Sequence, residues 1–548
     1  MKLSLKIAII ILAAASFIVY FNTLNNNFVY DDETIIVKNA DNLSLKNIPG
    51  YFTNQGEYRY VFGALYRPLI MTSLAIDHTL FGLKPGGYHF VNIVFHAVTT
   101  IFLFLILLML FGKNENGILA SLLSASIFAV HPVHTEAVSF ISSRTDVLAT
   151  MFFFLSLYNF LIYRGYVLPK FQKEKSKDKK HPPEIKQTGM KYLLYSLLFY
   201  FLGLLSKEMI ITLPIIFLLF DLLITRQKIK AVFKDYIFLF GVTLLYLAIR
   251  YFAIQGVETK PVFDWFYGKD AITIFATMVK TIPVYLKLLL FPVGLVYNYN
   301  GVIAYSNSIF DINSLLSLIF IIAVISLSFY LIKKKVYYSY SILIFFIGLL
   351  PVVNIIPTAN VMAERYLYML SFPLCVAVAY FITQNTNLKN LKTYTWVFVI
   401  VIIFFGFLTV QRNQVWKTNE TLWMSAEGDS SPASMINIAG LYTRSNQIDK
   451  AEKLYVDALA INQYMINAHI NLGIINMVRG KYDTAEVKLK SALDIDAKNP
   501  NANYMYAKLK LMTNKPIDAK KILENMEANS LEYKDSKRML DSLKKTGI

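Results

Sequence analysis

The chain has 548 residues, of which 55% are hydrophobic and only 16% are charged. A soluble domain carries about 25% charged residues, so the composition excludes an ordinary soluble enzyme. Apolar runs of roughly 20 residues recur, which is the length that crosses the hydrocarbon of a bilayer. The net charge of +18 would suggest nucleic acid in a soluble protein, but much of it lies between apolar runs. We therefore predict a polytopic membrane protein with no nucleic-acid partner.

The first apolar run, residues 5–22, is followed by bulky and polar residues instead of a small-residue cleavage site. We interpret it as a retained span and not as a signal peptide. Residues 271–291 contain Lys280, Pro283 and Lys287, which favours an interfacial helix and leaves a further span as the alternative. Ten more spans follow the first, to give about 11, at 89–112, 117–130, 146–163, 192–205, 209–224, 236–253, 314–332, 338–352, 366–384 and 394–411.

Basic residues predict the orientation of these spans. Residues 164–191 contain nine Lys or Arg, and residues 225–234 and 333–335 are also basic. Cytoplasmic loops are rich in Lys and Arg, and a cytoplasmic N-terminus with 11 spans puts all three segments inside. The C-terminal part is then extracytoplasmic. The Lys- and Asn-rich composition favours a prokaryotic cell membrane over an endoplasmic reticulum.

Beyond about residue 431 the sequence repeats with a period of 34. Small residues recur at Ala439, Gly473 and Ala507, and the register continues through Ala451, Ala485 and Ala519. Small residues at fixed positions let paired helices pack closely, as in tetratricopeptide repeats (TPR), which form a concave binding surface. The predicted fold is therefore all-α, with a membrane domain over 1–411, a linker over 412–430 and about three repeats over 431–548.

Four polar motifs fall at the predicted outer ends of the spans. The first is "NNNFVYDDETIIVKN" (25–39), where Asp31 and Asp32 stand between apolar clusters just after the first span. Adjacent acids often form a solvated turn or a helix N-cap. A carboxylate close to the membrane surface could instead act as a general base with a modestly raised pKa.

The second motif is "HPVHTEAVSFISSRTDVLA" (131–149). Its histidines lie three residues apart, which places them near each other on a helix, and imidazoles and carboxylates also bind many divalent metals. Three interpretations stay open: a substrate-facing site, a metal site and a hydrogen-bonded turn. The polar residues concerned are His131, His134, Glu136, Arg144 and Asp146.

The remaining motifs supply cations that match phosphate oxygens. "LLSKEMIIT" (204–212) contains Lys207 and Glu208, which could simply neutralise each other. "NVMAERYLYMLS" (360–371) contains Glu364, Arg365 and Tyr366, and the alternative there is an arginine that snorkels to lipid headgroups. Arg67 lies on an expected interfacial helix. Polar groups at the outer surface, not at mid-membrane, favour an enzyme with a lipid-linked donor over a transporter.

These four motifs, in this order and followed by the repeats, resemble the transmembrane-and-tetratricopeptide-repeat O-mannosyltransferases, which are polytopic glycosyltransferases of the GT-C type. The resemblance covers nearly the whole chain. The departures are a short repeat array and motif variants such as "SKEM". It implies transfer of a sugar, expected to be mannose, from a polyprenyl-phosphate donor to Ser or Thr hydroxyls of a polypeptide, with inversion. A membrane-anchored TPR scaffold without enzymatic activity is the main alternative.

The resemblance also implies roles for the motif residues. Asp31 and Asp32 match the acidic pair of the family and are the expected catalytic residues. Cations would surround the leaving phosphate, and the histidines with Glu136 would shape the sugar pocket, or hold a divalent metal if one is used. The residues expected to bind substrate are Arg67, His131, His134, Glu136, Arg144, Asp146, Lys207, Glu208, Glu364, Arg365 and Tyr366.

Overall fold

A computed structural model describes residues 4–53, 65–169, 189–255, 265–266, 268–355, 360–385, 388–526 and 533–545. Over these residues the regular secondary structure is helical apart from one isolated β-bridge between Asn300 and Ile303, which confirms the predicted all-α class. The chain forms two compact units. The first comprises residues 1–262, 268–297 and 305–422, and the second comprises residues 263–267, 298–304 and 423–548.

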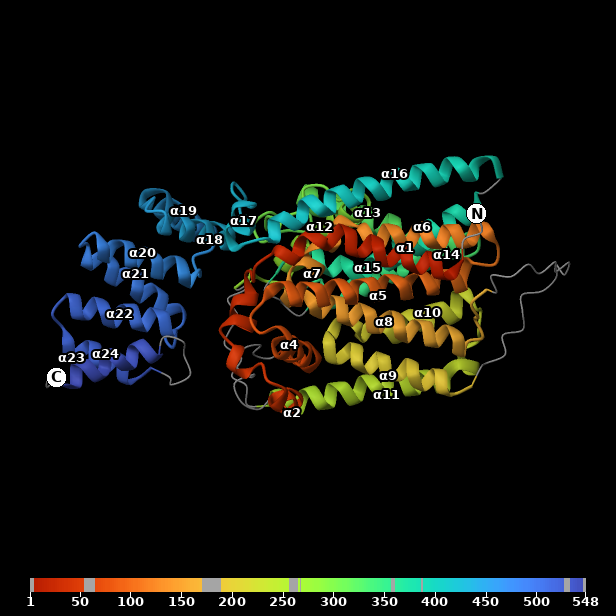
Figure 1. Ribbon diagram of the computed structural model, residues 1–548. Coiled ribbons are helices and arrows are strands. Elements are labelled where there is room, and N and C mark those ends of the chain that lie inside the picture. Colours follow the sequence, from red (N-terminus) through yellow and green to blue (C-terminus); the bar gives the residue numbers. More distant parts are fainter. Residues whose placement is uncertain are drawn as a thin grey trace. The chain divides into compact units, whose positions relative to one another are not determined.

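The first unit is a bundle of long apolar helices (Figure 1). Three helices, α5, α8 and α15, are mostly buried within the bundle, whereas α11, α13 and α16 expose most of their apolar surface, as lipid-facing helices do. The long helices are α1 (Leu5–Tyr20), α5 (Pro85–Phe111), α6 (Glu115–Val130), α8 (Arg144–Tyr163), α9 (Lys191–Ser206), α11 (Ile229–Ile254), α12 (Ala271–Leu290), α13 (Ile312–Leu331), α14 (Val336–Leu349), α15 (Leu367–Gln384) and α16 (Leu388–Asn413).

In the described residues, eight helices are long and apolar enough to cross a membrane, or nine if α6 and the bent segment after it form one span. This number includes α12, which was not among the 11 predicted spans. Two of those 11, α9 and the segment Val336–Val352, are short apolar helices instead. A third, residues 209–224, is divided into a 3-10 helix (Glu208–Thr212), α10 (Leu213–Leu219) and a π-helix (Phe220–Ile224).

Hydrogen bonds show which helix ends lie together. Asn413 at the end of α16 donates to the Val19 carbonyl at the end of α1 at 2.8 Å. Thr409 of α16 donates to the Val130 carbonyl at the end of α6 at 2.7 Å. We call this the acid-pair end, because Asp31 and Asp32 follow α1 directly. The opposite end, which carries the basic segments 225–234 and 333–335, is called the lysine-rich end; residues 170–188 of the predicted basic loop lie outside the described residues.

Helix α12 satisfies the length and apolarity criteria of a span, but its contacts are with segments at the acid-pair end. Ser314, at the start of α13, donates to the Ala276 carbonyl at 2.8 Å. Near the other end of α12, the Leu289 carbonyl lies 3.0 Å from His131 Nε2. These contacts at both of its ends agree with the predicted interfacial helix, which lies across the end of the bundle and not through it.

A helical cap covers part of the acid-pair end. It consists of residues 28–53, including α2 (Ile48–Thr53), and α4 (Pro68–Phe81). Phe28, Ile35 and Ile36, the apolar residues that flank the acids, are buried in one cluster with residues of α4 and the first turn of α5. The apolar flanks therefore anchor the acidic segment to the cap. The short helix α7 (Thr135–Ser139) also lies at this end.

The second unit is an array of antiparallel helix pairs (Figure 1, blue). The small residues of the 34-residue register, including Ala439, Ala451 and Ala485, are fully buried. A Cβ atom on Gly473 would lie only 2.8 Å from Leu489 Cγ, so the paired helices need a small residue there, which confirms the predicted repeat. The helices are α17 (Asn419–Met424), which begins in the first unit, α18 (Pro432–Arg444), α19 (Ile448–Ile461), α20 (Ile466–Val478), α21 (Tyr482–Ile495), α22 (Pro500–Met512), α23 (Pro516–Glu524) and α24 (Tyr533–Lys545).

Candidate active site

Asp32 is a buried carboxylate that joins two segments. Its Oδ1 accepts hydrogen bonds from the Ser142 backbone N–H at 2.8 Å and from the Ser142 hydroxyl at 2.5 Å. Its Oδ2 accepts from the Val29 N–H at 3.2 Å. Burial raises the pKa of Asp32 to about 7, although these hydrogen bonds act to lower it. Asp32 therefore fixes the segment after α1 to the turn that precedes α8.

Asp31 differs from its neighbour because it is exposed at the surface. The protein packed around its carboxyl still raises the pKa, the charge of Arg365 acts to lower it, and the charge of Glu136 acts to raise it. Of the two acids, Asp31 is the one that an incoming molecule can reach.

The backbone has an unusual conformation at Tyr30, directly before the two acids. Tyr30 has φ 54°, a left-handed conformation that is costly for a bulky side chain and that is often found at functional sites. Its N–H donates to Asn419 Oδ1 at 2.7 Å, and its ring contacts Phe140. A π-helix follows at Glu33–Val37, which is another rare conformation associated with functional sites.

Three cations gather around Tyr366 at the same end of the bundle. Lys207 Nζ lies 5.1 Å from the centre of the Tyr366 ring, and the Arg365 guanidinium carbon lies 5.4 Å from it. Burial lowers the pKa of Lys207, and the charges of Arg67 and Arg365 lower it further, while Asp146 acts to raise it. Contact with an aromatic face offsets part of the repulsion between such cations.

Each of these cations has an acidic partner. Arg67 binds Glu208 through two hydrogen bonds, of 3.1 and 2.6 Å. Burial acts to raise the pKa of Glu208, but Arg67 outweighs it and holds that pKa at about 2. The other pairs are Lys207 with Asp146, at 2.5 Å, and Arg365 with Glu136.

The three cations differ in their access to solvent. The side chains of Arg67 and Arg365 are 15% and 21% exposed, whereas that of Lys207 is 5% exposed. The two arginines can therefore contact a molecule at the surface, and Lys207 acts from beneath them. Glu364, next to Arg365, is buried and lies 3.5 Å from Arg412 of α16. It therefore joins the 3-10 helix Glu364–Tyr366, which precedes α15, to α16.

Arg144 is fully buried, in contrast to the expectation that it would be available to substrate. Its guanidinium forms an ion pair of 2.5 Å with Asp77 of α4. It also donates to Asn92 Oδ1 at 2.5 Å and to the Tyr88 carbonyl at 2.9 Å. Arg144 thus holds α4, α5 and α8 together beneath the acid pair.

The two motif histidines are also buried, and both ring nitrogens of each contact protein atoms. His131 contacts the Leu289 carbonyl through Nε2 and accepts from the Val133 N–H through Nδ1. His134 contacts the Phe128 carbonyl and the Ser371 hydroxyl, at 2.9 and 2.8 Å. Nitrogens engaged in this way do not fit a metal ligand set. No group of three or more metal-binding side chains occurs within the described ranges.

Comparisons with known proteins show similarity to one group of membrane proteins. The chain is 27% identical to protein O-mannosyl-transferase TMTC3 of Homo sapiens over 497 residues, which cover 83% of this chain and 51% of that protein. It is 26% identical to protein O-mannosyl-transferase tmtc2 of Xenopus laevis over 556 residues, which cover 83% of this chain and 62% of that protein. Residues 478–530 match the tetratricopeptide repeat family model.

Over most of its length the chain is similar to the TMTC protein O-mannosyl-transferases. A local match to TMTC2 of Homo sapiens reaches 35% identity over 172 residues, which cover 29% of this chain and 20% of that protein. The chain spans about half the length of the first relatives it matches. Its apolar helices and its repeat match make the chain a multi-pass membrane protein with TPR helices, as the apolar runs and the 34-residue period predict.

Several residues of the candidate site were not predicted. Ser142, Asp77 and Asn419 form the bonds that hold Asp32, Arg144 and Tyr30. Ser142 lies within the second motif but was not singled out there, and Asp77 and Asn419 lie outside the four motifs. Their partners are far away in the chain, so only the folded structure brings them together. The run of asparagines at 25–27 was the nearest signal, because Asn26 and Asn27 bond to residues 413 and 417.

Proposed function

We propose that this protein transfers mannose from a polyprenyl-phosphate donor to Ser or Thr hydroxyls of a polypeptide, and that transfer takes place at the acid-pair end. The observation that carries the proposal is the exposed carboxylate of Asp31 beside a cluster of cations at the end of a membrane bundle. A base next to a phosphate-binding surface, within reach of lipid, suits a lipid-phosphate sugar donor. Homology to the TMTC proteins supports the same reaction.

In the proposed mechanism Asp31 is the general base. Its carboxylate takes the proton from the acceptor hydroxyl while the hydroxyl oxygen attacks the anomeric carbon of the sugar. The bond between that carbon and the phosphate oxygen breaks, its electron pair stays on the polyprenyl phosphate, and the configuration inverts. The raised pKa of Asp31 makes it a stronger base than an ordinary aspartate.

The cations would stabilise the leaving phosphate. Negative charge develops on that group as the sugar departs, and preplaced cations lower the energy of the transition state. Arg365 and Arg67 reach the surface and carry several donors that match phosphate oxygens. Lys207 adds charge below them. Glu136, Asp146 and Glu208 keep the three cations apart and oriented before the donor binds.

The buried motif residues are positioning residues in this proposal. Asp32 fixes the segment that presents Asp31, and Arg144 fixes the helices beneath it. His131 and His134 join the α6–α7 turn to α12 and α15. Glu364 and Tyr366 support Arg365 and Lys207 from the 3-10 helix before α15.

The proposal also assigns sides and an acceptor. The acid-pair end faces the extracytoplasmic side because the basic segments 225–234 and 333–335 lie at the other end, and basic loops are retained in the cytoplasm. The TPR unit binds the acceptor polypeptide or a partner protein, since helical repeat arrays bind peptides on their concave face.

The test uses the purified full chain in lipid nanodiscs with radiolabelled polyprenyl-phosphate mannose and co-purifying polypeptides. The wild type is expected to label the polypeptides. Asp31→Asn should lower the rate by about 10²–10⁴-fold, which is the usual contribution of a general base. Its unfolding temperature should match that of the wild type, because Asp31 is exposed.

Asp41→Asn is the matched control, because Asp41 is another exposed acid in the same cap. It should retain wild-type activity. An Asp31→Asn protein with full activity would contradict the assignment of the base. A wild-type chain that labels no polypeptide from this donor would contradict the proposed reaction and favour the scaffold.

A further inference from the structure

A second feature lies at the lysine-rich end, far along the helices from the acid pair. A cavity of about 420 Å³ opens there, and both basic segments contribute to its wall. Two of its lining residues, Arg226 and Lys333, are cationic and exposed. The other three are apolar and half-buried: Leu222, Leu223 and Ile332. A cationic rim over an apolar wall is suited to an amphipathic anion.

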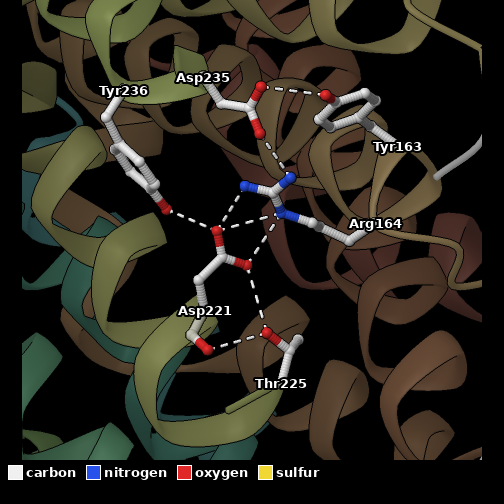
Figure 2. Close-up of polar contacts among 6 residues, drawn as sticks. All are labelled: Tyr163, Arg164, Asp221, Thr225, Asp235 and Tyr236. Atoms are coloured by element: carbon white, nitrogen blue, oxygen red, sulfur yellow. Dashed lines mark hydrogen bonds and ion pairs between the residues drawn. The ribbon is translucent and has the colours of Figure 1, made fainter. Parts of the chain in front are cut away.

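The wall of this cavity is fixed by a buried ion cluster, shown in Figure 2. Arg164, at the end of α8, forms two ion pairs of 2.6 Å, with Asp221 and with Asp235 of α11. Tyr236 donates to Asp221 at 2.8 Å, and Tyr163 donates to Asp235 at 3.0 Å. These bonds satisfy charges that would otherwise be costly inside a membrane protein.

Asp221 also fixes the turn that carries Arg226. Its backbone carbonyl accepts from the Thr225 hydroxyl at 2.9 Å and from the Gln227 N–H at 2.8 Å. Arg226 is thus held between two residues that both bond to Asp221. It directly follows the π-helix Phe220–Ile224 and Thr225, and the π-helix contributes Leu222 and Leu223 to the cavity wall.

Arg226 itself has φ 54°. A left-handed conformation is uncommon and unfavourable for a residue with a long side chain, so it persists only where the surroundings impose it. Here the surroundings are the two bonds to Asp221. An outlier of this kind is a reason to look for a function at the residue, and its place on the cavity rim supplies one.

We propose that this cavity binds the headgroup of an anionic phospholipid, with Arg226 and Lys333 on the phosphate and the apolar wall along the start of the acyl chains. No ion pair is formed by Arg226 or Lys333 with any carboxylate in the described parts of the chain. The buried cluster carries one excess negative charge, since two aspartates face one arginine. The two rim cations outweigh it, so the site as a whole is positive by one charge.

The test measures lipid binding to the purified full chain in a neutral detergent by native mass spectrometry. Dioleoyl phosphatidylglycerol and dioleoyl phosphatidylcholine are each titrated into the protein, and their affinities are compared. The wild type should hold one phosphatidylglycerol molecule more tightly than phosphatidylcholine. Arg226→Gln with Lys333→Gln should weaken phosphatidylglycerol binding about 25-fold, at about fivefold for each cation. Glycine adopts the left-handed conformation without strain, so Arg226→Gly should remain folded. It should weaken phosphatidylglycerol binding about fivefold, the effect of one cation.

The matched control is Lys230→Gln with Lys234→Gln. It removes the same charge from the same end of the bundle, but neither lysine lines the cavity. An equal loss in this control would show general attraction to the surface and would overturn the site. Unchanged phosphatidylglycerol binding in the rim variants would overturn it as well. If glycerol 3-phosphate binds as tightly as the lipid, the apolar wall contributes nothing to binding. That result would overturn the proposal that the site binds a phospholipid.

Discussion

At the scale of single residues, neighbouring acids in this chain have different environments. Asp31 and Asp32 are adjacent, yet the first is exposed and the second is buried. The difference comes from Tyr30, whose left-handed backbone turns the chain just before the pair, and from Ser142, which supplies two donors to one carboxylate only. The two acids should therefore respond differently to pH and to substitution.

The pH dependence of stability tests the environment of Asp32. Its pKa is raised by burial to about 7, compared with roughly 3.9 in an unfolded chain. The folded state therefore holds the proton more tightly, so this contribution to stability is complete below about pH 4 and is lost as pH rises through 7. The loss is on the order of 4 kcal/mol.

The measurement is thermal unfolding in detergent at several pH values between 4 and 8. The unfolding temperature of the wild type should fall with rising pH more steeply than that of Asp32→Asn, which has no carboxyl to titrate. Asp41→Asn should keep the wild-type slope. Identical slopes for the wild type and Asp32→Asn would mean that Asp32 titrates normally.

The sequence revealed most of the charged and polar residues of the candidate site as clusters. It did not reveal which of these side chains are exposed and which are buried. The motifs indicated Arg144, His131 and His134 as groups that face a substrate, and the structure places all three inside the protein. A polar residue at the end of an apolar run can point outward to a ligand or inward to a distant partner. For Arg144 that partner is Asp77, in a helix whose position the sequence does not reveal.

At the scale of helices, the last span and the segment after it are joined to the acidic segment. Asn413 donates to Asn22 Oδ1 at 2.9 Å and accepts from the Ser139 hydroxyl at 2.8 Å. The Trp416 ring stacks on Phe140 with 5.2 Å between the centres. Asn419 then accepts from the Tyr30 N–H. The start of α17 thereby helps to set the backbone that presents Asp31.

Asn419→Ala tests this link. Loss of the acceptor should let Tyr30 relax from its left-handed conformation and displace Asp31, and small displacements of a catalytic group are costly. The expected result is a kcat about tenfold lower with little change in the KM for the lipid-linked donor. Glu420→Ala, at the exposed neighbouring position, is the control, and Asn419→Asp should restore kcat because its carboxylate also accepts. A KM increase with unchanged kcat would contradict this positioning role.

Helices were the most predictable feature of the chain, because long apolar runs have few other structures open to them in a membrane. The single segment predicted at 209–224 is the instructive exception. Asp221 within it forms an ion pair with Arg164, which also pairs with Asp235, and a π-helix forms at that point. The mean hydropathy of the segment is still high despite Asp221, and it does not indicate which residues Asp221 contacts. For α12, in contrast, two lysines and a proline in the sequence predicted the interfacial placement that its contacts indicate.

At the scale of the whole molecule, the two ends of the bundle differ in charge and in proposed role. Orientation in the membrane can be tested with introduced cysteines, because the natural Cys375 is buried. Asp41→Cys marks the acid-pair end and Lys230→Cys marks the lysine-rich end, and both positions are exposed. In intact cells a membrane-impermeant maleimide should label Asp41→Cys, and it should label Lys230→Cys only after permeabilisation.

The wild type is the control for that experiment and should stay unlabelled in both conditions. Labelling of Lys230→Cys in intact cells would reverse the orientation and place the acid pair in the cytoplasm. The repeat array was predictable as a repeat because small residues such as Gly473 recur with its period, whereas nothing in its sequence identifies a binding partner.

The ion pair of Arg144 and Asp77 has a consequence for how such chains diverge. Each side chain is almost fully enclosed, so the loss of one would leave the other as a buried charge without its counter-ion. A lineage could not pass through either single replacement without a large loss of stability. When related sequences are aligned, we expect the two positions either to keep both charges or to become neutral together, although they lie on different helices.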